Sequence, residues 1–309
     1  MSQQAESTSA APAPDHRRRN WAVAKVAGFF FGLALFAAAI GMVWHQREAM
    51  SAALASARHP EWWQVALLAG AVAANIVLTA LLFSILIARF GRVSLIEMQA
   101  IIASATLINF LPLRPGLFGR IAYHKAVHRI RAIDTGRTIV EASAISAILG
   151  AWLIGASLLA RFAGVPLWIG VTIPGPVLMA LLFMRDHRRI AGASIVRYIE
   201  VFVWALRYWV AFQVMAHPID GSTALALASV SMIASMTPFV SNGLGLREWA
   251  IGLLTPVMAT GAMSLELGVA AELINRGAEI AIVLVLGLAG TMALVPRLHA
   301  AGRKSSRRA

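Results

Sequence analysis

Long apolar runs alternate with short polar and basic stretches along most of this chain. Six runs approach or exceed the length that crosses a bilayer: 26–45, 64–88, 138–160, 165–184, 198–216 and 271–296. A helix rises about 1.5 Å per residue, so roughly 20 apolar residues cover a hydrocarbon core of about 30 Å. The pattern predicts an all-α polytopic membrane protein with six spanning helices.

Two further apolar segments, 95–130 and 221–258, are interrupted by Pro, Gly and Arg. The first contains PLRPGLFGR at 112–120, and the second contains PFVSNGLGLR at 238–247. Broken backbone survives at membrane depth only inside protein or beside a watery cavity. We therefore predict a re-entrant helical hairpin in each segment, with breaks at Pro112 and Gly116 and at Pro238, Gly243 and Gly245.

Composition agrees with this class, because hydrophobic residues make up 59% of the chain and charged residues 13%, with a mean hydropathy of +0.73. Cytoplasmic flanks accumulate Lys and Arg. Most of the 27 Lys and Arg fall on inner flanks if both termini are cytoplasmic and the hairpins enter from opposite sides, the first from the cytoplasm. This distribution predicts a multi-pass protein of a bacterial inner membrane.

The net charge of +13 does not indicate nucleic acid, because the basic residues are scattered along membrane edges. Anionic lipid head groups are the better partner for such residues. Residues 1–20 are predicted to form a disordered basic tail rather than a signal peptide, and 297–309 a basic cytoplasmic tail. The chain has no cysteine, which excludes disulfides and thiolate metal sites.

The two broken segments share one order: an apolar helix, a Pro, a Gly-Leu-x-x-Arg, and a second helix. Each is followed by a span that opens with a glutamate, Glu141 or Glu272. This order predicts an inverted repeat within one transmembrane domain, 21–296. The first repeat covers about 62–163 with hairpin 95–130, and the second about 195–296 with hairpin 221–258. In such repeats the discontinuous helices build a substrate site near the bilayer midplane.

An arginine at membrane depth is costly and usually retained for a partner or a substrate. Arginines beside freed N–H groups at helix starts make an anion site. We predict a lipid head-group site formed by Arg114, Arg120, Arg247 and Arg276, with Glu141, Glu248, Glu272 and Glu279 balancing their charge. The alternatives are snorkelling of the first two arginines, an Arg247–Glu248 ion pair, and a packed charge ladder along one face of the last helix.

Other polar residues carry weaker signals. Arg207 stands among aromatic residues and is expected to pair with a carboxylate of another helix, Glu200 or Glu141. His124 and His128 have a spacing that zinc accepts, but no third ligand stands in register, so no metal site is predicted. GxxxxGK[ST] is absent from the sequence, and no cofactor is expected.

The sequence resembles the flippase-like membrane domain of lysylphosphatidylglycerol synthases and its stand-alone relatives. The resemblance rests on 109-NFLPLRPGLFGR-120, on 238-PFVSNGLGLRE-248 and on Glu272 to Arg276, and covers roughly residues 25–296. The helix beginning at Glu141 departs from the family, whose members often carry Glu-Arg followed by an acidic residue there. The synthase domain that makes the lysyl-lipid is not expected here, because only a short basic tail follows residue 297.

The resemblance implies translocation of an anionic or amino-acylated phospholipid, or of a polyprenyl-phosphate-linked lipid. Two other functions stay open: an integral-membrane transferase that modifies such a lipid, and a scaffold that holds a lipid-synthesising enzyme at the membrane. No catalytic constellation is found, and the paired aspartates of metal-dependent sugar transfer are missing. The sequence leaves open a homodimer and the energy source for transport.

Overall fold

Three helices in the described part of the chain are long and apolar enough to cross a membrane. The computed structural model describes residues 60–111, 114–184, 187–236, 241–261 and 263–306, and within these ranges it contains helices and no strand. The three are α3 (Trp62–Ile87), α6 (Ala132–Phe162) and α12 (Leu265–Ser306). They match the predicted spans 64–88, 138–160 and 271–296, whereas 26–45 lies outside the described residues.

Two predicted spans differ from a simple apolar crossing. Segment 165–184 forms two consecutive helices, α7 (Leu167–Thr172) and α8 (Pro174–Phe183). Together they are shorter than the three long apolar helices. Segment 198–216 lies in α9 (Arg188–Val214), which is 27 residues long but buries three charged residues, Arg197, Glu200 and Arg207.

Each broken segment forms two helices separated by a break. The first consists of α4 (Leu95–Ile108) and α5 (Pro115–His128). The second consists of α10 (Gly221–Ser235), the 3-10 turn η1 (Ser241–Gly243) and α11 (Leu246–Met258). Pro112 and Pro238 lie outside the described residues.

A side-chain cap starts the first helix of each pair. The Ser94 hydroxyl accepts a hydrogen bond from Glu97 N at 3.3 Å, and the Asp220 carboxylate accepts one from Thr223 N at 2.7 Å. Such caps satisfy an amide that has no partner within the helix. Burial acts to raise the pKa of Asp220, but the hydrogen bonds from Thr223 and Ser222 outweigh it and hold the pKa below its usual range.

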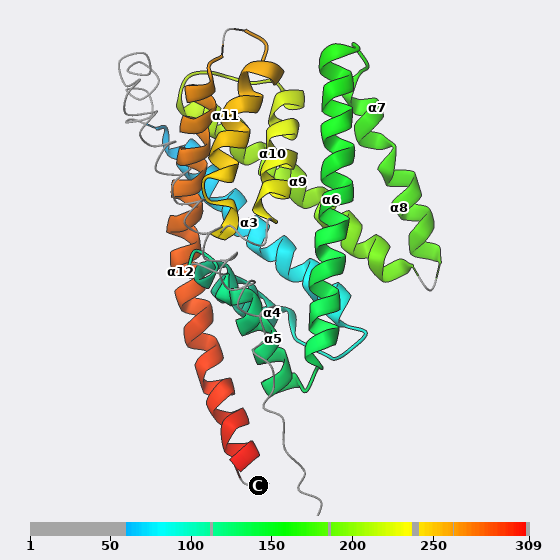
Figure 1. The fold of residues 1–309 in the computed structure, drawn as a ribbon, viewed down its shortest axis with the longest axis vertical. Coiled ribbons are helices and arrows are strands. Elements are labelled where there is room, and N and C mark those ends of the chain that lie inside the picture. The colour runs from blue at the N-terminus through cyan, green and yellow to red at the C-terminus, as the bar shows by residue number, and fades with distance from the viewer. Residues whose placement is uncertain (1–59, 112–113, 185–186, 237–240, 262, 307–309) are drawn as a thin grey trace, which may run out of the picture.

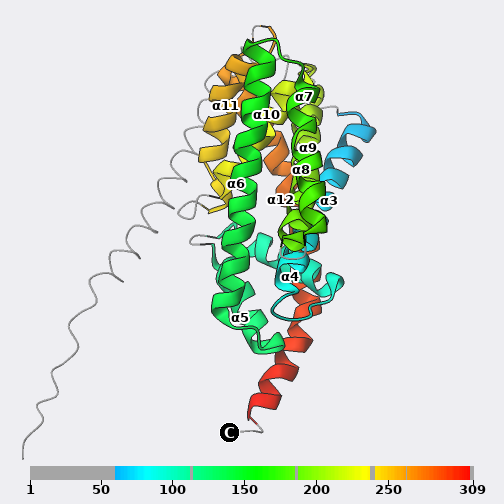
Figure 2. The ribbon, with the colours of Figure 1, turned by 90° about the vertical axis from the view of Figure 1, so that its right-hand side faces the viewer.

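The two helix pairs occupy opposite halves of the molecule (Figure 1). A long helix that follows each pair packs against the other pair: α12 lies beside α4, and α6 lies beside α10. Glycine permits the first contact, because a Cβ at Gly287 would lie 2.6 Å from the Leu107 Cβ, and one at Gly290 would lie 2.7 Å from the Ala100 carbonyl oxygen. Figure 2 shows α6 running along most of the elongated molecule.

Large apolar side chains cover much of the lateral surface. Phe183 is 85% exposed, Met292 69% and Val140 67%. Soluble monomers rarely expose so many large apolar side chains over their long helices. This surface suits contact with lipid, in agreement with the three membrane-compatible helices.

Candidate functional site

Residues that flank the two breaks are in direct contact. Arg114 stands at the start of α5 in a left-handed conformation with φ of 49°. Its Nη1 donates a hydrogen bond to the carbonyl oxygen of Ser235, 3.1 Å away and 121 residues later in the chain. Ser235 ends α10, directly before the second break. The two broken segments, far apart in sequence, are therefore joined beside their breaks.

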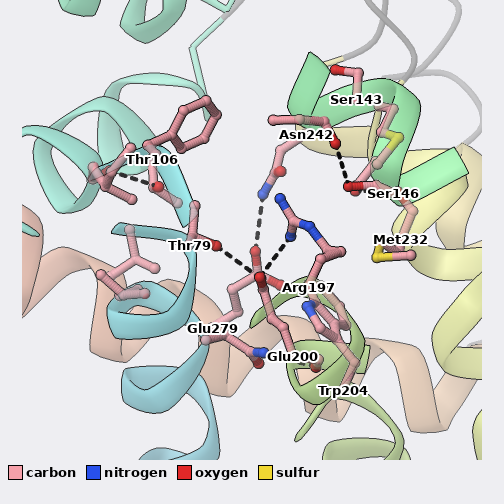
Figure 3. A pocket seen from close by; sticks show the side chains of 18 of the residues that line it. Thr79, Thr106, Ser143, Ser146, Arg197, Glu200, Trp204, Met232, Asn242 and Glu279 are labelled. Carbon is pink, nitrogen blue, oxygen red and sulfur yellow. Dashed lines mark hydrogen bonds and ion pairs between the residues drawn. The ribbon is translucent and has the colours of Figure 1, made fainter. Parts of the chain in front are cut away.

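A cavity of about 330 Å³ lies where the breaks meet. Residues of α3, α4, α5, α6, α9, α10 and α12 line it, together with Arg114 from the first break and Asn242 from the second. Figure 3 shows how the polar side chains converge on it. Its charged lining residues are three arginines and two glutamates: Arg114, Arg197, Arg207, Glu200 and Glu279.

One wall of the cavity carries an ion pair that the sequence analysis missed. Arg197 Nη1 donates to Glu200 Oε2 at 2.7 Å, and the Thr79 hydroxyl donates to Glu200 Oε1 at 2.8 Å (Figure 3). Asn75 Nδ2 donates to the Glu200 carbonyl oxygen at 3.3 Å. The spacing of Arg197, Glu200 and Arg207 puts them on one helix face, and this periodicity was the signal available in the sequence.

A buried charged cluster adjoins the cavity and contains Arg247. Its Nη2 lies 2.7 Å from Glu272 Oε1, and its Nη1 donates to Glu279 Oε2 at 3.0 Å. Arg207 Nη2 donates to the same Glu279 oxygen at 3.1 Å, and its Nε donates to Asn275. Glu279 therefore joins the cavity to Arg247, which α11 supplies.

Arg276 and Glu248 form a neighbouring ion pair that also joins α12 to α11. Arg276 donates to Glu248 Oε1 through Nε at 3.2 Å and Nη2 at 3.1 Å. Its Nη1 donates to the Asn242 carbonyl oxygen at 3.0 Å, which ties α12 to the second break. Consecutive helical residues point about 100° apart, so Arg247 and Glu248 reach different partners. The alternative of an Arg247–Glu248 ion pair is therefore wrong.

This cluster is balanced in charge and closed to solvent. It contains three arginines and three glutamates, all less than a tenth exposed: Arg207, Arg247, Arg276, Glu248, Glu272 and Glu279. Tyr208, Asn75, Asn242 and Asn275 satisfy further oxygen and nitrogen atoms of the cluster. A paired, hydrogen-bonded network of this kind fixes geometry. Its members hold the second break in place.

The remaining predicted residues lie elsewhere. Glu141 pairs with Arg89 near the surface, where each side chain is 30% exposed. The Arg120 guanidinium lies 3.8 Å from the Phe83 ring centroid and lines a different cavity. Neither Arg120 nor Arg247 lines the 330 Å³ cavity, and Glu141 and Glu272 do not form its walls. The expected partner of Arg207 was also wrong, since Arg207 pairs with Glu279.

The two histidines face different partners. His124 Nδ1 lies 3.3 Å from the Thr135 hydroxyl, and His128 Nε2 lies 2.9 Å from Glu97 Oε1. In the described residues, no three His, Cys, Asp or Glu side chains come together as metal ligands. The pair belongs to the packing of α5 against α4 and α6.

Comparisons of the chain with protein-family models, curated proteins and solved structures gave no match. Function therefore has to be inferred from the cavity, its charges and the fold around it.

Proposed function

We propose that this protein binds the acidic head group of a phospholipid or polyprenyl-phosphate lipid in the 330 Å³ cavity and moves that lipid across a membrane. The observation that carries the proposal is the lining of the cavity, where three arginines face two glutamates. A phosphate group suits a lining in which arginines outnumber glutamates. Arginine suits this task because its planar fork matches phosphate oxygens.

The order of elements supports a transport function. Helices α3, α4, α5 and α6 recur in kind as α9, α10, α11 and α12: a long helix, a broken pair, and a long helix. We infer an inverted repeat with two re-entrant hairpins that enter from opposite sides. With 26–45, 165–184 and 198–216 as further spans, both termini would lie in the cytoplasm of a bacterial cell. Transporters of this plan bind substrate at the interface between repeats.

The lining offers separate contacts to the parts of a lipid. Arg114 at the start of α5 suits a phosphate, because its guanidinium matches phosphate oxygens. The hydroxyls of Thr79, Ser143 and Ser146 line the same cavity and can contact a glycerol or sugar. Val72 and Val283 are among the apolar side chains of the lining. The resemblance to flippase-like domains points to the same class of ligand, with a lipid-synthesising enzyme as a partner.

Reconstituted liposomes test the proposal through a head-group-labelled phosphatidylglycerol and an impermeant quencher. We expect the wild-type chain to increase the quenched fraction, Arg114→Gln to reduce the rate at least about tenfold, and Arg114→Lys to restore part of it. Lys125→Gln, an exposed change on the same helix, is the matched control and should leave the rate unchanged.

Two outcomes would overturn transport in favour of the alternatives. A new lipid species in the same liposomes, detected by mass spectrometry, would indicate a transferase. No lipid movement by the wild-type chain, together with copurification of a lipid-synthesising enzyme at a fixed ratio, would indicate a scaffold. Equal rates for the wild type and Arg114→Gln would reject the cavity as the head-group site.

A further inference from the structure

A second cavity, of about 400 Å³, lies between α4, α5 and α12. Ligand pockets commonly have volumes of roughly 300 to 1,000 Å³. Small residues on one face of α5 create the space, since Gly116, Gly119, Ala122 and Ala126 all line it. We call this cavity the lateral groove.

The lateral groove opens to the lipid-facing surface. Gly119, Ala122 and Ala126 are exposed, and across the groove Val295 and Leu298 are 42% and 41% exposed. The polar groups of its lining are satisfied, except for one. The Ser104 and Thr291 hydroxyls bond each other at 2.8 Å, and the Tyr123 hydroxyl donates to Glu97 at 2.7 Å.

Arg120 is the exception, and among the described residues that line the groove it is the one charged residue. Its side chain is about 95% buried, at 5% exposed, and its Nε has no hydrogen-bond partner. No ion pair of Arg120 is found in the described part of the chain, and among charged groups it is another cation, Arg114, that acts on it. The Phe83 ring beneath the guanidinium offers only a cation–π contact. A buried cation without a carboxylate is costly unless a ligand supplies the anion.

We propose that the lateral groove binds one hydrocarbon chain of an anionic lipid, whose acidic group pairs with Arg120. The chain lies among apolar side chains of α4, α5 and α12, and the acid satisfies Arg120. This site is separate from the central cavity: α4 and α5 lie between them, with Ile102 and Leu117 on the central side and Ile101 and Gly119 on the groove side. It therefore does not depend on lipid transport.

Thiol protection locates the bound lipid, because the chain has no native cysteine. Ala126→Cys places a thiol in the groove, and Ser146→Cys places one in the central cavity. The protein is held in nanodiscs of phosphatidylcholine with added dioleoyl phosphatidylglycerol, dioleoylglycerol or inorganic phosphate, and the maleimide labelling rate is measured. We expect phosphatidylglycerol to protect Ala126→Cys, dioleoylglycerol to protect it more weakly, and phosphate alone not to protect it.

Arg120→Gln should raise the phosphatidylglycerol concentration for half protection about tenfold and leave dioleoylglycerol unaffected. Gly119→Leu should abolish protection by both lipids, since a Cβ there meets no atom within 4 Å and the added side chain fills the groove. Lys125→Gln and Gly155→Leu are the matched controls. Protection by phosphate alone, or equal protection by the charged and neutral lipids, would overturn the proposal. Protection that persists in Arg114→Gln would support this site even if transport fails.

Discussion

Arg247 and Glu272 form an ion pair of 2.7 Å in which both side chains are wholly excluded from solvent. The pair joins α11 to α12, and a shared contact with Glu279 joins it to Arg207. Neither side chain has access to water, so the charge of each is compensated by its protein partners. The pair is consequently a poor place to test ligand binding and a good place to test folding.

Arg247→Met should lower the free energy of unfolding by roughly 3 to 5 kcal/mol, because it leaves Glu272 buried without its cation. Adding Glu272→Gln should recover part of the loss, since the second change removes the uncompensated charge. Urea denaturation of the purified protein in detergent measures both. Arg131→Met breaks an ion pair with Asp134. Because the Arg131 side chain is 72% exposed, this change should lower the free energy of unfolding by less than about 1 kcal/mol. Equal losses at the two arginines would contradict the buried network.

Gly116, beside the first break, has no room for a side chain. A Cβ at Gly116 would lie 2.1 Å from the Ala105 carbonyl oxygen and 2.7 Å from Asn109 Oδ1, so Gly116→Ala must push α5 away from α4. We expect a loss of roughly 1 to 3 kcal/mol, measured by the same denaturation. Gly119→Ala on the same helix meets nothing within 4 Å and should leave stability unchanged. A neutral Gly116→Ala would mean that the two helices are not so closely packed.

The broken segments could be predicted from sequence because Pro and Gly act locally. Gly243 and Gly245 adopt φ of 71° and 78°, conformations that other residues rarely take, and their pattern therefore marks the second break directly. The face shared by Glu272, Arg276 and Glu279 also followed from helical spacing, and all three are buried.

The ion-pair partners could not be predicted in this way. Helical spacing gives the face of a side chain but not the helix opposite it, so Arg207 was assigned to Glu200 or Glu141 rather than to Glu279. Glu141 was placed at the site because it was expected to open a span after a break, as Glu272 was. The helices begin earlier, at Ala132 and Leu265, and Glu141 pairs with Arg89, which follows the end of α3. Which carboxylate balances which arginine depends on how the two halves pack, a long-range property.

Contact between α4 and α12 predicts a cross-link across the two halves. The Leu107 Cβ lies 2.6 Å from a Cβ built at Gly287, so Leu107→Cys with Gly287→Cys should form a disulfide after a small outward shift of the helices. Oxidation should give an intramolecular species that migrates faster in a non-reducing gel. Leu107→Cys with Gly277→Cys is the control, because ten residues along a helix correspond to about 15 Å. A cross-link in the control pair, or none in the test pair, would contradict this packing.

Membrane orientation gives the last prediction, and the exposed residues Arg131 and Thr260 can report it. Arg131 precedes α6 at the end occupied by the α4–α5 pair, and Thr260 follows α11 at the other end (Figure 1). If the hairpins enter from opposite sides, Thr260→Cys should react with an impermeant maleimide in intact cells. Arg131→Cys should react only after permeabilisation, and the wild-type chain, which has no cysteine, gives the background. Labelling of Arg131→Cys from outside would place the basic end of the molecule outside the cell. That result would contradict the rule that Lys and Arg accumulate on cytoplasmic flanks. The inverted repeat would then no longer be part of the proposed function.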